Sequence, residues 1–246
     1  MQAMDSKTTD LMRTLDVLAA ELDALTFSSP VTHVYNPLVY AREPTRLYIE
    51  RYAGLGAENV LIGMNPGPWG MAQTGVPFGA VDPARDWLGL EAEVDAPPNI
   101  HPKRPVEGFA CRRAEVSGMR VWGWAEDVFG TPERFFRSFF IHNYCPLLFL
   151  ADTARNVTPD KLQASERLAM QAPCDRALRR FIEILEPKRV IGVGVWAEAR
   201  AKEVLEGLDV EIRRILHPSP ASPIANRGWA EQASAQLEQM GIVLPS

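Results

Sequence analysis

The chain has 246 residues, of which 46% are hydrophobic and 23% are charged. These proportions are typical of a soluble globular protein and exclude a disordered, collagen-like or coiled-coil chain, while the length suits one large α/β domain. Acidic residues outnumber basic ones by 31 to 26, which gives a formal net charge of −5. Since no overall cationic field attracts a polyanion, any nucleic-acid binding requires a local basic patch.

The three cysteines, Cys111, Cys145 and Cys174, lie far apart and form no C-x-x-C pair. This spacing supports neither a disulfide framework nor a zinc or iron–sulfur site, so no metal is expected. The N-terminal residues lead into an amphipathic segment rather than an apolar signal core, and no run reaches the roughly 18 apolar residues that a membrane span requires. We therefore expect a cytoplasmic protein with no membrane association.

Helical patterns occur along most of the chain. Leucines recur at steps of three and four residues from Asp10 to Leu25, which predicts a helix packed on one side. A second helix is predicted from Pro44 to Gly54, because proline suits a first helical turn and glycine ends a helix. Further helices are predicted from Pro132 (with Thr131 as N-cap), from Pro173 to Leu185, from Trp196 to Leu205, and from about Arg227 to Met240.

Four short apolar runs have the length of buried strands, at residues 59–63, 139–142, 189–193 and 210–216. Because helical patterns separate them, the expected fold class is α/β with a parallel sheet. The segment 81–121 differs, since it is long, rich in proline and glycine, and basic in several places. A loop of that length is usually functional or disordered.

The residues that follow the predicted strands form the natural list of site candidates, because ligands of open parallel sheets bind at the carboxyl ends of the strands. The first strand leads into residues 63–79, where five glycines and three prolines fix an irregular backbone that can approach a flat ligand. That segment contains Asn65 and Phe78. The second strand is followed by Asn143 and the fourth by His217, so we expect these four side chains to converge.

This set of side chains suggests a definite chemistry. An asparagine offers one acceptor and two donors, enough to read the edge of an amide-like ring such as uracil. A histidine can stabilise negative charge on a departing heterocycle, and a second asparagine can hold a water molecule. No carboxylate belongs to the set, which argues against metal-dependent phosphoryl transfer. Taken singly, each residue also has a structural interpretation, as a turn cap, a core histidine or a core aromatic ring.

The same residues carry a family resemblance. Segment 63–79, together with His217-Pro218-Ser219-Pro220 and Ala225-Asn226-Arg227-Gly228-Trp229, resembles the single-strand-selective monofunctional uracil-DNA glycosylase family. Shorter similar motifs occur at residues 34–37, 104–106, 115–118, 142–147, 155–159 and 193–194. The resemblance implies a three-layer αβα sandwich with a central four-stranded parallel sheet. It also implies a single uracil-DNA glycosylase-like domain over residues 1–246, although residues 1–30 lie outside the motifs.

The resemblance assigns roles to the converging side chains. Asn65 would position the hydrolytic water, and His217 would stabilise the negative charge that grows on the uracil O2. Asn143 would read the Watson–Crick edge of the base, and Phe78 would stack on its face. The reaction would be hydrolysis of the N-glycosidic bond, without a lyase step and without a cofactor.

Three further residues would complete the base pocket. The backbone of Met64 would contact the base, and Gly67 and Pro68 would line the pocket near C5. At that position the family leaves room for a water molecule or a 5-hydroxymethyl group. We therefore expect uracil, and also 5-hydroxymethyluracil, as substrates.

The protein is expected to be a monomer that binds uracil-containing DNA. This binding must overcome the negative net charge of the protein. Local positive charge is available at Arg112, Arg113, Arg213 and Arg214. The expected DNA contacts are Arg155, Lys161, Ser219, Pro220, Ser222, Pro223, Ile224 and Arg227. Vertebrate relatives carry an arginine at the position of Ala221, so we expect weaker opening of duplex DNA in this chain.

Other functions compete with this interpretation. A related glycosylase could prefer a deaminated purine such as hypoxanthine or xanthine, with Trp69 tuning the pocket. A DNA-lesion-binding module could keep the pocket without catalysis. A thiol hydrolase could combine Cys145 with His217, although a cysteine before proline at a strand end is typical of a small buried hydrophobe.

Overall fold

A computed structural model describes residues 6–245, so residues 1–5, on which the expectation of no signal sequence partly depends, lie outside the described residues. The helices are α1 (Ser6–Asp23), α2 (Pro37–Tyr40), α3 (Arg42–Tyr52), α4 (Met71–Thr74), α5 (Val116–Phe129), α6 (Pro132–Phe136), α7 (Ala164–Leu185), α8 (Val195–Val204) and α9 (Trp229–Gln239). The strands are β1 (Val31–Tyr35), β2 (Asn59–Gly63), β3 (Phe139–Asn143), β4 (Leu148–Ala151), β5 (Arg189–Val193) and β6 (Glu211–Ile215).

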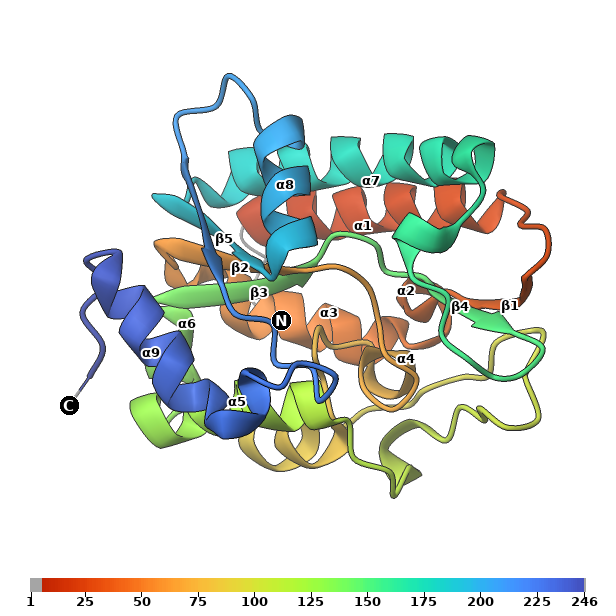
Figure 1. The fold of residues 1–246 in the computed structure, drawn as a ribbon, viewed down its shortest axis with the longest axis horizontal. Coiled ribbons are helices and arrows are strands. Elements are labelled where there is room, and N and C mark those ends of the chain that lie inside the picture. Colours follow the sequence, from red (N-terminus) through yellow and green to blue (C-terminus); the bar gives the residue numbers. More distant parts are fainter. Residues whose placement is uncertain (1–5, 246) are drawn as a thin grey trace.

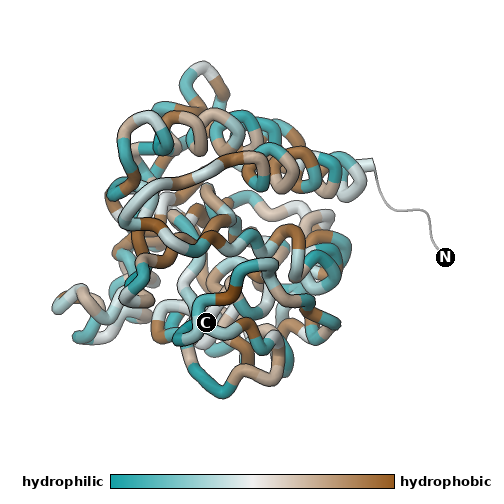
Figure 2. The backbone as a smooth tube through the Cα atoms, turned by 90° about the vertical axis from the view of Figure 1, so that its right-hand side faces the viewer, coloured by the Kyte–Doolittle hydropathy of each residue, from teal (hydrophilic) through white to brown (hydrophobic). Residues whose placement is uncertain are grey.

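The central sheet has four parallel strands in the order β3-β2-β5-β6, which confirms the predicted fold class. Helices α1, α7 and α8 lie on one side of it, and α5, α6 and α9 lie on the other (Figure 1). Every residue of β2 and β3 is buried, which explains why both strands are largely apolar runs rather than alternating patterns. The outer helices alternate between hydrophilic and hydrophobic positions along their length, as amphipathic cover for the sheet requires (Figure 2).

The free edge of β3 is covered by a side chain of α3. The Tyr48 hydroxyl donates to the Ile141 carbonyl (2.8 Å) and accepts from the Ile141 amide (3.3 Å). Its ring packs against Phe136 and Phe140. Tyr48 thus satisfies a backbone donor and acceptor that would otherwise be exposed at an edge strand.

Most predicted elements occur within a few residues of their expected bounds, but α7 does not begin at Pro173. It begins at Ala164, and Pro173 lies buried inside the helix. Proline removes one helical hydrogen bond, so it usually marks a helix boundary. Packing decides otherwise here, because residues on both sides of Pro173 join the core, among them Met170 and Cys174.

Two features were not predicted. A second sheet pairs β1 with β4 in antiparallel orientation, with Tyr35 opposite Leu148. The apolar run Leu147–Leu150 was the available signal for β4. The expected long loop 81–121 is also shorter than predicted, because it includes short helical turns at Pro83–Trp87 and Gly108–Ala110 and ends where α5 begins.

Within residues 6–245, no helix is both long enough and apolar enough to cross a membrane.

Candidate active site

A cavity of about 380 Å³ lies at the carboxyl ends of the parallel strands. It brings together the four predicted side chains from three strand ends: Asn65 and Phe78 after β2, Asn143 at the end of β3, and His217 after β6. The other lining residues are Met64, Pro66, Gly67, Met71, Glu115, Ser117, Asn156, Thr158 and Ser219. This cavity is the candidate active site.

Asn65 is held by backbone pairing that continues past the ends of β2 and β3. The Tyr144 and Cys145 amides donate to the carbonyls of Gly63 and Met64, both at 2.9 Å. The Asn65 Nδ2 donates to the Leu147 carbonyl at 3.2 Å. Because this bond engages the amide nitrogen, Oδ1 is left as the group that can accept a hydrogen bond in the cavity.

His217 follows β6 and has a defined tautomer. The Ser219 amide donates to His217 Nδ1 at 3.0 Å, so Nδ1 is an acceptor and the proton of the neutral ring is on Nε2. Burial lowers the pKa of His217 below its usual value of 6.5, which favours the neutral ring. The preceding residue is fixed as well, because the Trp229 indole N–H donates to the Leu216 carbonyl at 2.7 Å.

Phe78 and Asn143 pack closely against Gly63. A Cβ on Gly63 would overlap with Asn143 Oδ1 and lie 2.7 Å from Phe78 Cε2, so this contact requires glycine. Phe78 itself has a positive φ of 54°. That conformation is strained for a bulky residue, and such strain is concentrated at functional sites. Thr74 stabilises the turn by donating to the Gly79 carbonyl at 2.7 Å.

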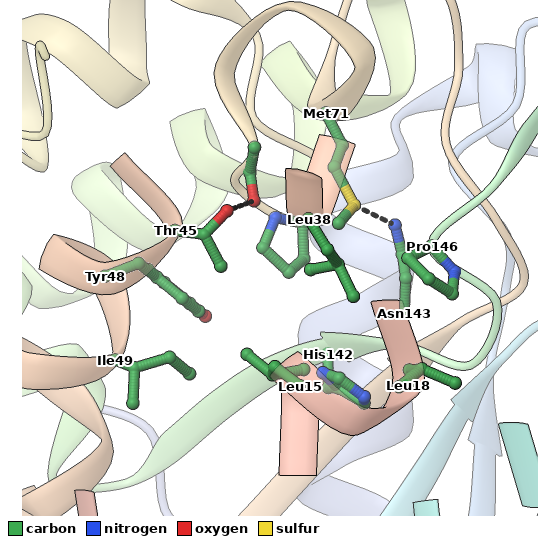
Figure 3. A pocket seen from close by; sticks show the side chains of 12 residues that line it. Leu15, Leu18, Leu38, Thr45, Tyr48, Ile49, Met71, His142, Asn143 and Pro146 are labelled. Atoms are coloured by element: carbon green, nitrogen blue, oxygen red, sulfur yellow. Dashed lines mark hydrogen bonds between the residues drawn. The ribbon is translucent and has the colours of Figure 1, made fainter. Parts of the chain in front are cut away.

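Asn143 also borders a second, much smaller cavity. Its Nδ2 contacts Met71 Sδ at 3.2 Å, and both residues line a space of about 20 Å³ between α1, α3 and the end of β3 (Figure 3). His142 lines this space too, and burial lowers its pKa to about 4. A volume of that size holds one water molecule at most, so no base can bind there.

The glycine- and proline-rich segment is attached to the neighbouring loop by Gln73. The Gln73 amide donates to the carbonyls of Pro68 (2.9 Å) and Pro105 (3.0 Å), and its oxygen accepts from the Glu107 amide (2.8 Å). Gly67 lines the cavity directly. Pro68 is not among the lining residues, and its carbonyl instead anchors this segment to Gln73.

Trp69 lies outside the cavity lining, so the structure does not support the hypothesis that it tunes the base pocket. Two guanidinium groups lie over its ring instead. The Arg113 carbon Cζ lies 4.5 Å from the ring centroid, and that of Arg104 lies 5.2 Å from it. Trp69 thus fixes two cations next to the loop that forms one wall of the site.

The structure adds a carboxyl group that the sequence argument did not include. Glu115 lines the cavity, and burial raises the pKa of its side chain to about 7. The motif containing Glu115 was recognised, but its spacing gave no indication that the side chain turns inward. In residues 6–245, no three His, Cys, Asp or Glu side chains are grouped so that they could hold a metal ion.

Asn156 is a second lining residue that sequence reasoning missed. It follows Arg155 in a recognised motif, and its Nδ2 lies 3.4 Å from the Pro66 carbonyl. Asn65 Nδ2 lies at the same distance from that carbonyl. Asn156 therefore braces the backbone beside Asn65.

The loop from His217 to Gly228 contains most of the residues predicted to contact DNA. Arg120 of α5 braces this loop by donating to the Pro218 carbonyl (2.9 Å) and to Asn226 Oδ1 (2.8 Å). Ser219 lines the cavity. Ser222 is partly exposed, whereas Pro220, Pro223, Ile224 and Arg227 are exposed, as are Arg155 and Lys161 on the chain after β4.

The predicted basic residues differ in how far carboxylates neutralise them. Lys161, Arg213 and Arg214 form ion pairs with Asp160, Glu211 and Glu198. Within the described part of the chain, no ion pair involves Lys103, Arg104, Arg112, Arg113 or Arg155. The first four of these belong to the loop that Gln73 attaches to the site.

Cys145 does not fit the role of a thiol nucleophile. Its side chain is fully buried, and it is not among the residues that line the cavity. It behaves as the small buried hydrophobe that its position before Pro146 suggested.

The arrangement of layers and strands has a counterpart among solved structures. The crystal structure of wild-type SMUG2 from Pedobacter heparinus superimposes with a TM-score of 0.63, covering 93% of this chain and 97% of that one at 16% identity. At that identity the likeness concerns the fold. The chain is therefore an α/β protein that shares the fold of this SMUG2 structure and carries an asparagine–histidine cavity at the ends of its parallel strands.

Comparison with known proteins identifies the family to which this chain belongs. Three relatives, from Rattus norvegicus, Mus musculus and Bos taurus, are single-strand selective monofunctional uracil-DNA glycosylases. Each is 50% identical to this chain over 225 to 228 residues, which is 91–92% of this chain and 82–83% of the relative. No family model matches the sequence. The chain belongs to the single-strand selective monofunctional uracil-DNA glycosylase family.

Proposed function

We propose that this protein hydrolyses the N-glycosidic bond between uracil and deoxyribose in DNA, releases the free base and leaves an abasic site without cleaving the strand. The observation that carries the proposal is the pairing of Asn65 with His217 in one cavity. The two side chains come from different strands, and each is oriented by a backbone hydrogen bond. The target nucleotide must rotate out of the helix to enter such a cavity.

Recognition of the base is assigned to Asn143, Phe78 and the backbone of Met64. The Asn143 carboxamide can accept from uracil N3–H and donate to O4. Its present partner, Met71 Sδ, is a weak acceptor, so the exchange for a carbonyl oxygen costs little. The ring of Phe78, held against Gly63, supplies a flat apolar surface on which the base can stack.

Departure of the base is assigned to His217. As the C1′–N1 bond breaks, its electron pair moves onto the uracil ring and negative charge grows on O2. The Nε2–H of the neutral imidazole can donate to that oxygen, in a geometry already fixed by Ser219. A preorganised donor of this kind contributes about 10²- to 10³-fold in rate.

Addition of water is assigned to Asn65. Its Oδ1 can accept a hydrogen bond from a water molecule and orient the oxygen toward C1′. An amide cannot act as a charged base, so the glycosidic bond should be largely broken before the water adds. The water oxygen bonds to C1′, and its released proton balances the charge of the departing uracil anion.

DNA contacts are assigned to two surfaces next to the cavity. Ser219, Pro220, Ser222, Pro223 and Ile224 would press on the duplex beside the flipped nucleotide. Arg155, Lys161 and Arg227 would contact phosphates, and their contribution would weaken with salt. Lys161 should contribute least of these three cations, because Asp160 lies 3.1 Å away.

The test uses end-labelled single- and double-stranded oligonucleotides with one uracil, incubated with EDTA and then treated with alkali. We expect cleavage only after alkali, and its loss in both Asn65→Ala and His217→Ala. His33→Ala serves as a control, because His33 does not line the cavity. Cleavage before alkali would contradict the absence of a lyase step.

The same assay distinguishes the competing functions. Failure on uracil, but activity on hypoxanthine or xanthine, would favour a glycosylase for deaminated purines. Failure on all of these bases and on 5-hydroxymethyluracil, with DNA binding retained, would favour a lesion-binding module.

A further inference from the structure

We infer that Trp69, Arg104 and Arg113 form a phosphate clamp that holds the backbone of a DNA strand on one side of the flipped nucleotide. The inference rests on the proposed function, since it takes uracil-containing DNA as the ligand. It adds a binding surface outside the cavity to the DNA contacts assigned above, none of which involves these three residues.

The phosphate clamp lies beside one wall of the cavity. Gly67 and Glu115 line this wall and contact each other, since a Cβ on Gly67 would be 2.6 Å from Glu115 Oε2. Trp69 follows Gly67 by two positions, and Arg113 precedes Glu115 by two. Because consecutive Cα atoms are about 3.8 Å apart, both residues lie within about 8 Å of the wall along the chain. The first few phosphates of a strand that enters the cavity are therefore within reach.

The ring of Trp69 orients both guanidinium groups. The Cζ atoms lie 4.5 Å (Arg113) and 5.2 Å (Arg104) from the ring centroid. The ring is itself anchored, because it packs against a buried cluster of Val81, Ala84, Phe109 and Cys111. A guanidinium group over an aromatic face still has N–H donors at its edge for an oxyanion. Arginines that are held in place before DNA binds lose less side-chain entropy on binding.

Hydrogen bonds from Gln73 fix the backbone on which the clamp is built. The Gln73 amide donates to the carbonyls of Pro68 (2.9 Å) and Pro105 (3.0 Å), which adjoin Trp69 and Arg104. Gln73 is almost fully buried, so this link does not depend on a mobile surface side chain. The two segments that carry the ring and one of its cations are thus fixed relative to each other.

Carboxylates do not neutralise the positive charge of the clamp. Neither Arg104 nor Arg113 forms an ion pair within residues 6–245. Asp82 lines a small cavity together with Arg113, but its carboxylate pairs with Arg85 at 3.1 Å. A guanidinium group binds two oxygens of one phosphate through parallel N–H bonds. Two such groups beside a DNA-binding cavity therefore suit neighbouring phosphodiesters of the strand.

The clamp should act on only one side of the flipped nucleotide. A nucleotide in the cavity continues into the strand in two directions, toward the 5′ and the 3′ end. The clamp adjoins the wall of Gly67 and Glu115, whereas the DNA contacts assigned above lie on segments 155–161 and 219–227, which reach the cavity through Thr158 and Ser219. Phosphates in one direction can contact the clamp, and those in the other direction cannot.

Binding of single-stranded oligonucleotides tests the inference. Each carries one uracil and is long on both sides of it, short on the 5′ side, or short on the 3′ side. Fluorescence anisotropy measures the affinity in an Asn65→Ala background, so that the base is not excised during the titration. We expect shortening on one side to weaken binding about tenfold more than shortening on the other, the scale of one charged hydrogen-bonded contact. Equal losses on both sides would overturn the inference.

Arg113→Gln and Arg112→Gln, placed in the same background, are matched variants. The two arginines are adjacent and exposed, and of the two it is Arg113 that lies over the ring of Trp69. In Arg113→Gln, the losses on the two sides should agree within about twofold, whereas Arg112→Gln should keep the one-sided loss. Two variants that behave alike, or a one-sided loss that persists in Arg113→Gln, would overturn the inference.

Trp69→Leu removes the ring and leaves every charge in place. We expect the one-sided loss to become at least about threefold smaller, because the guanidinium groups lose the surface that orients them. Trp69 is partly buried, so thermal unfolding checks that this variant folds. An unchanged one-sided loss in the folded variant would overturn the role of the ring. Arg113 is exposed, so Arg113→Gln tests the clamp even if Trp69→Leu does not fold.

A further pair of oligonucleotides identifies the chemical group that the clamp binds. On the side that strengthens binding, the strand is extended either by nucleotides or by sugar-phosphate units without bases. We expect gains in affinity that agree within about twofold, because the clamp contacts phosphate oxygens. A gain that requires bases would overturn the phosphate clamp and favour stacking of a base on Trp69.

These readouts separate the inference from the function on which it depends. If the wild type does not excise uracil, the proposed function is overturned, while the one-sided binding of DNA still tests the clamp. If the wild type excises uracil and binding shows no preferred side, only the clamp is overturned.

Discussion

At the scale of single residues, the site depends on two titratable groups whose pKa values burial shifts in opposite senses. Burial lowers the pKa of His217 and raises that of Glu115 to about 7, because it disfavours the charged form of each. Both groups are therefore stabilised in their neutral forms in the cavity. A neutral imidazole with its proton on Nε2 can donate to an oxyanion without first having to lose a proton.

Acidification should inactivate the protein through His217. Protonation would place an N–H on Nδ1 opposite the Ser219 amide, replacing a hydrogen bond with a repulsion. We expect single-turnover excision of uracil from single-stranded DNA to fall as the pH drops, with a midpoint below 6.5. Glu115→Gln, which removes the other titration in the cavity, should keep this acid limb. A rate that rises on acidification would contradict the assigned tautomer.

Glu115→Gln should also make the protein relatively more stable at alkaline pH. The folded-state pKa of about 7 lies above the ordinary value of 4.5, so the stability that this group provides is fully present below pH 4.5 and lost as the pH rises through 7. The difference corresponds to about 3 kcal/mol at most. Thermal unfolding at pH 5 and pH 8 measures it, and an equal effect of the substitution at both values would show that the carboxyl is not desolvated.

At the scale of elements, glycines allow neighbouring segments to approach the ends of the strands. Gly63 ends β2, where Asn143 of β3 and Phe78 of the following loop meet. Gly194, between β5 and α8, has a φ of 94°, and a Cβ there would lie 3.2 Å from His217 Cβ. The cavity thus depends on backbone contacts between adjacent elements as much as on its polar side chains.

Gly63→Ala should abolish most of the activity. The added methyl would displace Asn143 Oδ1 and Phe78, the two groups assigned to base recognition. We expect a loss of about 10²-fold or more in excision, since a misplacement of about 1 Å is enough for such an effect. Gly123→Ala in α5 is the matched control, because a Cβ there meets no atom within 4 Å. Equal activity of the two variants would show that the site tolerates this displacement.

The loop between β6 and α9 carries a short side chain, Ala221, where an arginine would reach into the duplex. Arg120 and Asn226 hold the loop firmly, so its backbone is suited to carry a wedge. Ala221→Arg should raise excision from double-stranded DNA several-fold and change single-strand excision less. Ala221→Met provides a long side chain without charge. An unchanged duplex rate in Ala221→Arg would count against a wedge at this position.

At the scale of the whole molecule, the protein is acidic, but some of its arginines are not neutralised by a carboxylate. These arginines can contact a polyanion such as DNA. Three arginines on α7, Arg176, Arg179 and Arg180, form ion pairs, for example Arg176 with Glu21 at 2.8 Å. Arg112 and Arg113, close to the cavity wall, form no ion pair within residues 6–245. The local field beside the site can therefore be positive although the net charge is −5.

Removing one of these free cations should reduce the salt dependence of DNA binding. For Arg113→Gln we expect the slope of log affinity against log salt concentration to fall by about 0.7 to 0.9, the amount for one phosphate contact. Arg176→Gln removes the same charge from a paired position and should leave the slope unchanged. Titration of a fluorescent oligonucleotide at several salt concentrations measures both, and equal slopes would show that net charge alone governs binding.

Local sequence patterns determined most of the secondary structure and three residues of the candidate site. Apolar runs and helical periodicity identified the four parallel strands and most helices, because burial on both faces and amphipathic packing leave periodic patterns. The rule that ligands bind at the carboxyl ends of parallel strands then selected Asn65, Asn143 and His217. All three line one cavity in the structure.

The tertiary structure decided what has no local pattern. The start of α7, the pairing of β1 with β4 and the contacts of Trp69 with two arginines depend on contacts between distant segments. The inward turn of Glu115 likewise depends on two glycines that precede it by 48 and 45 positions. Whether a charged residue is solvated or buried depends on which other segments cover it, so only the folded chain could place a carboxyl group with a raised pKa in the cavity.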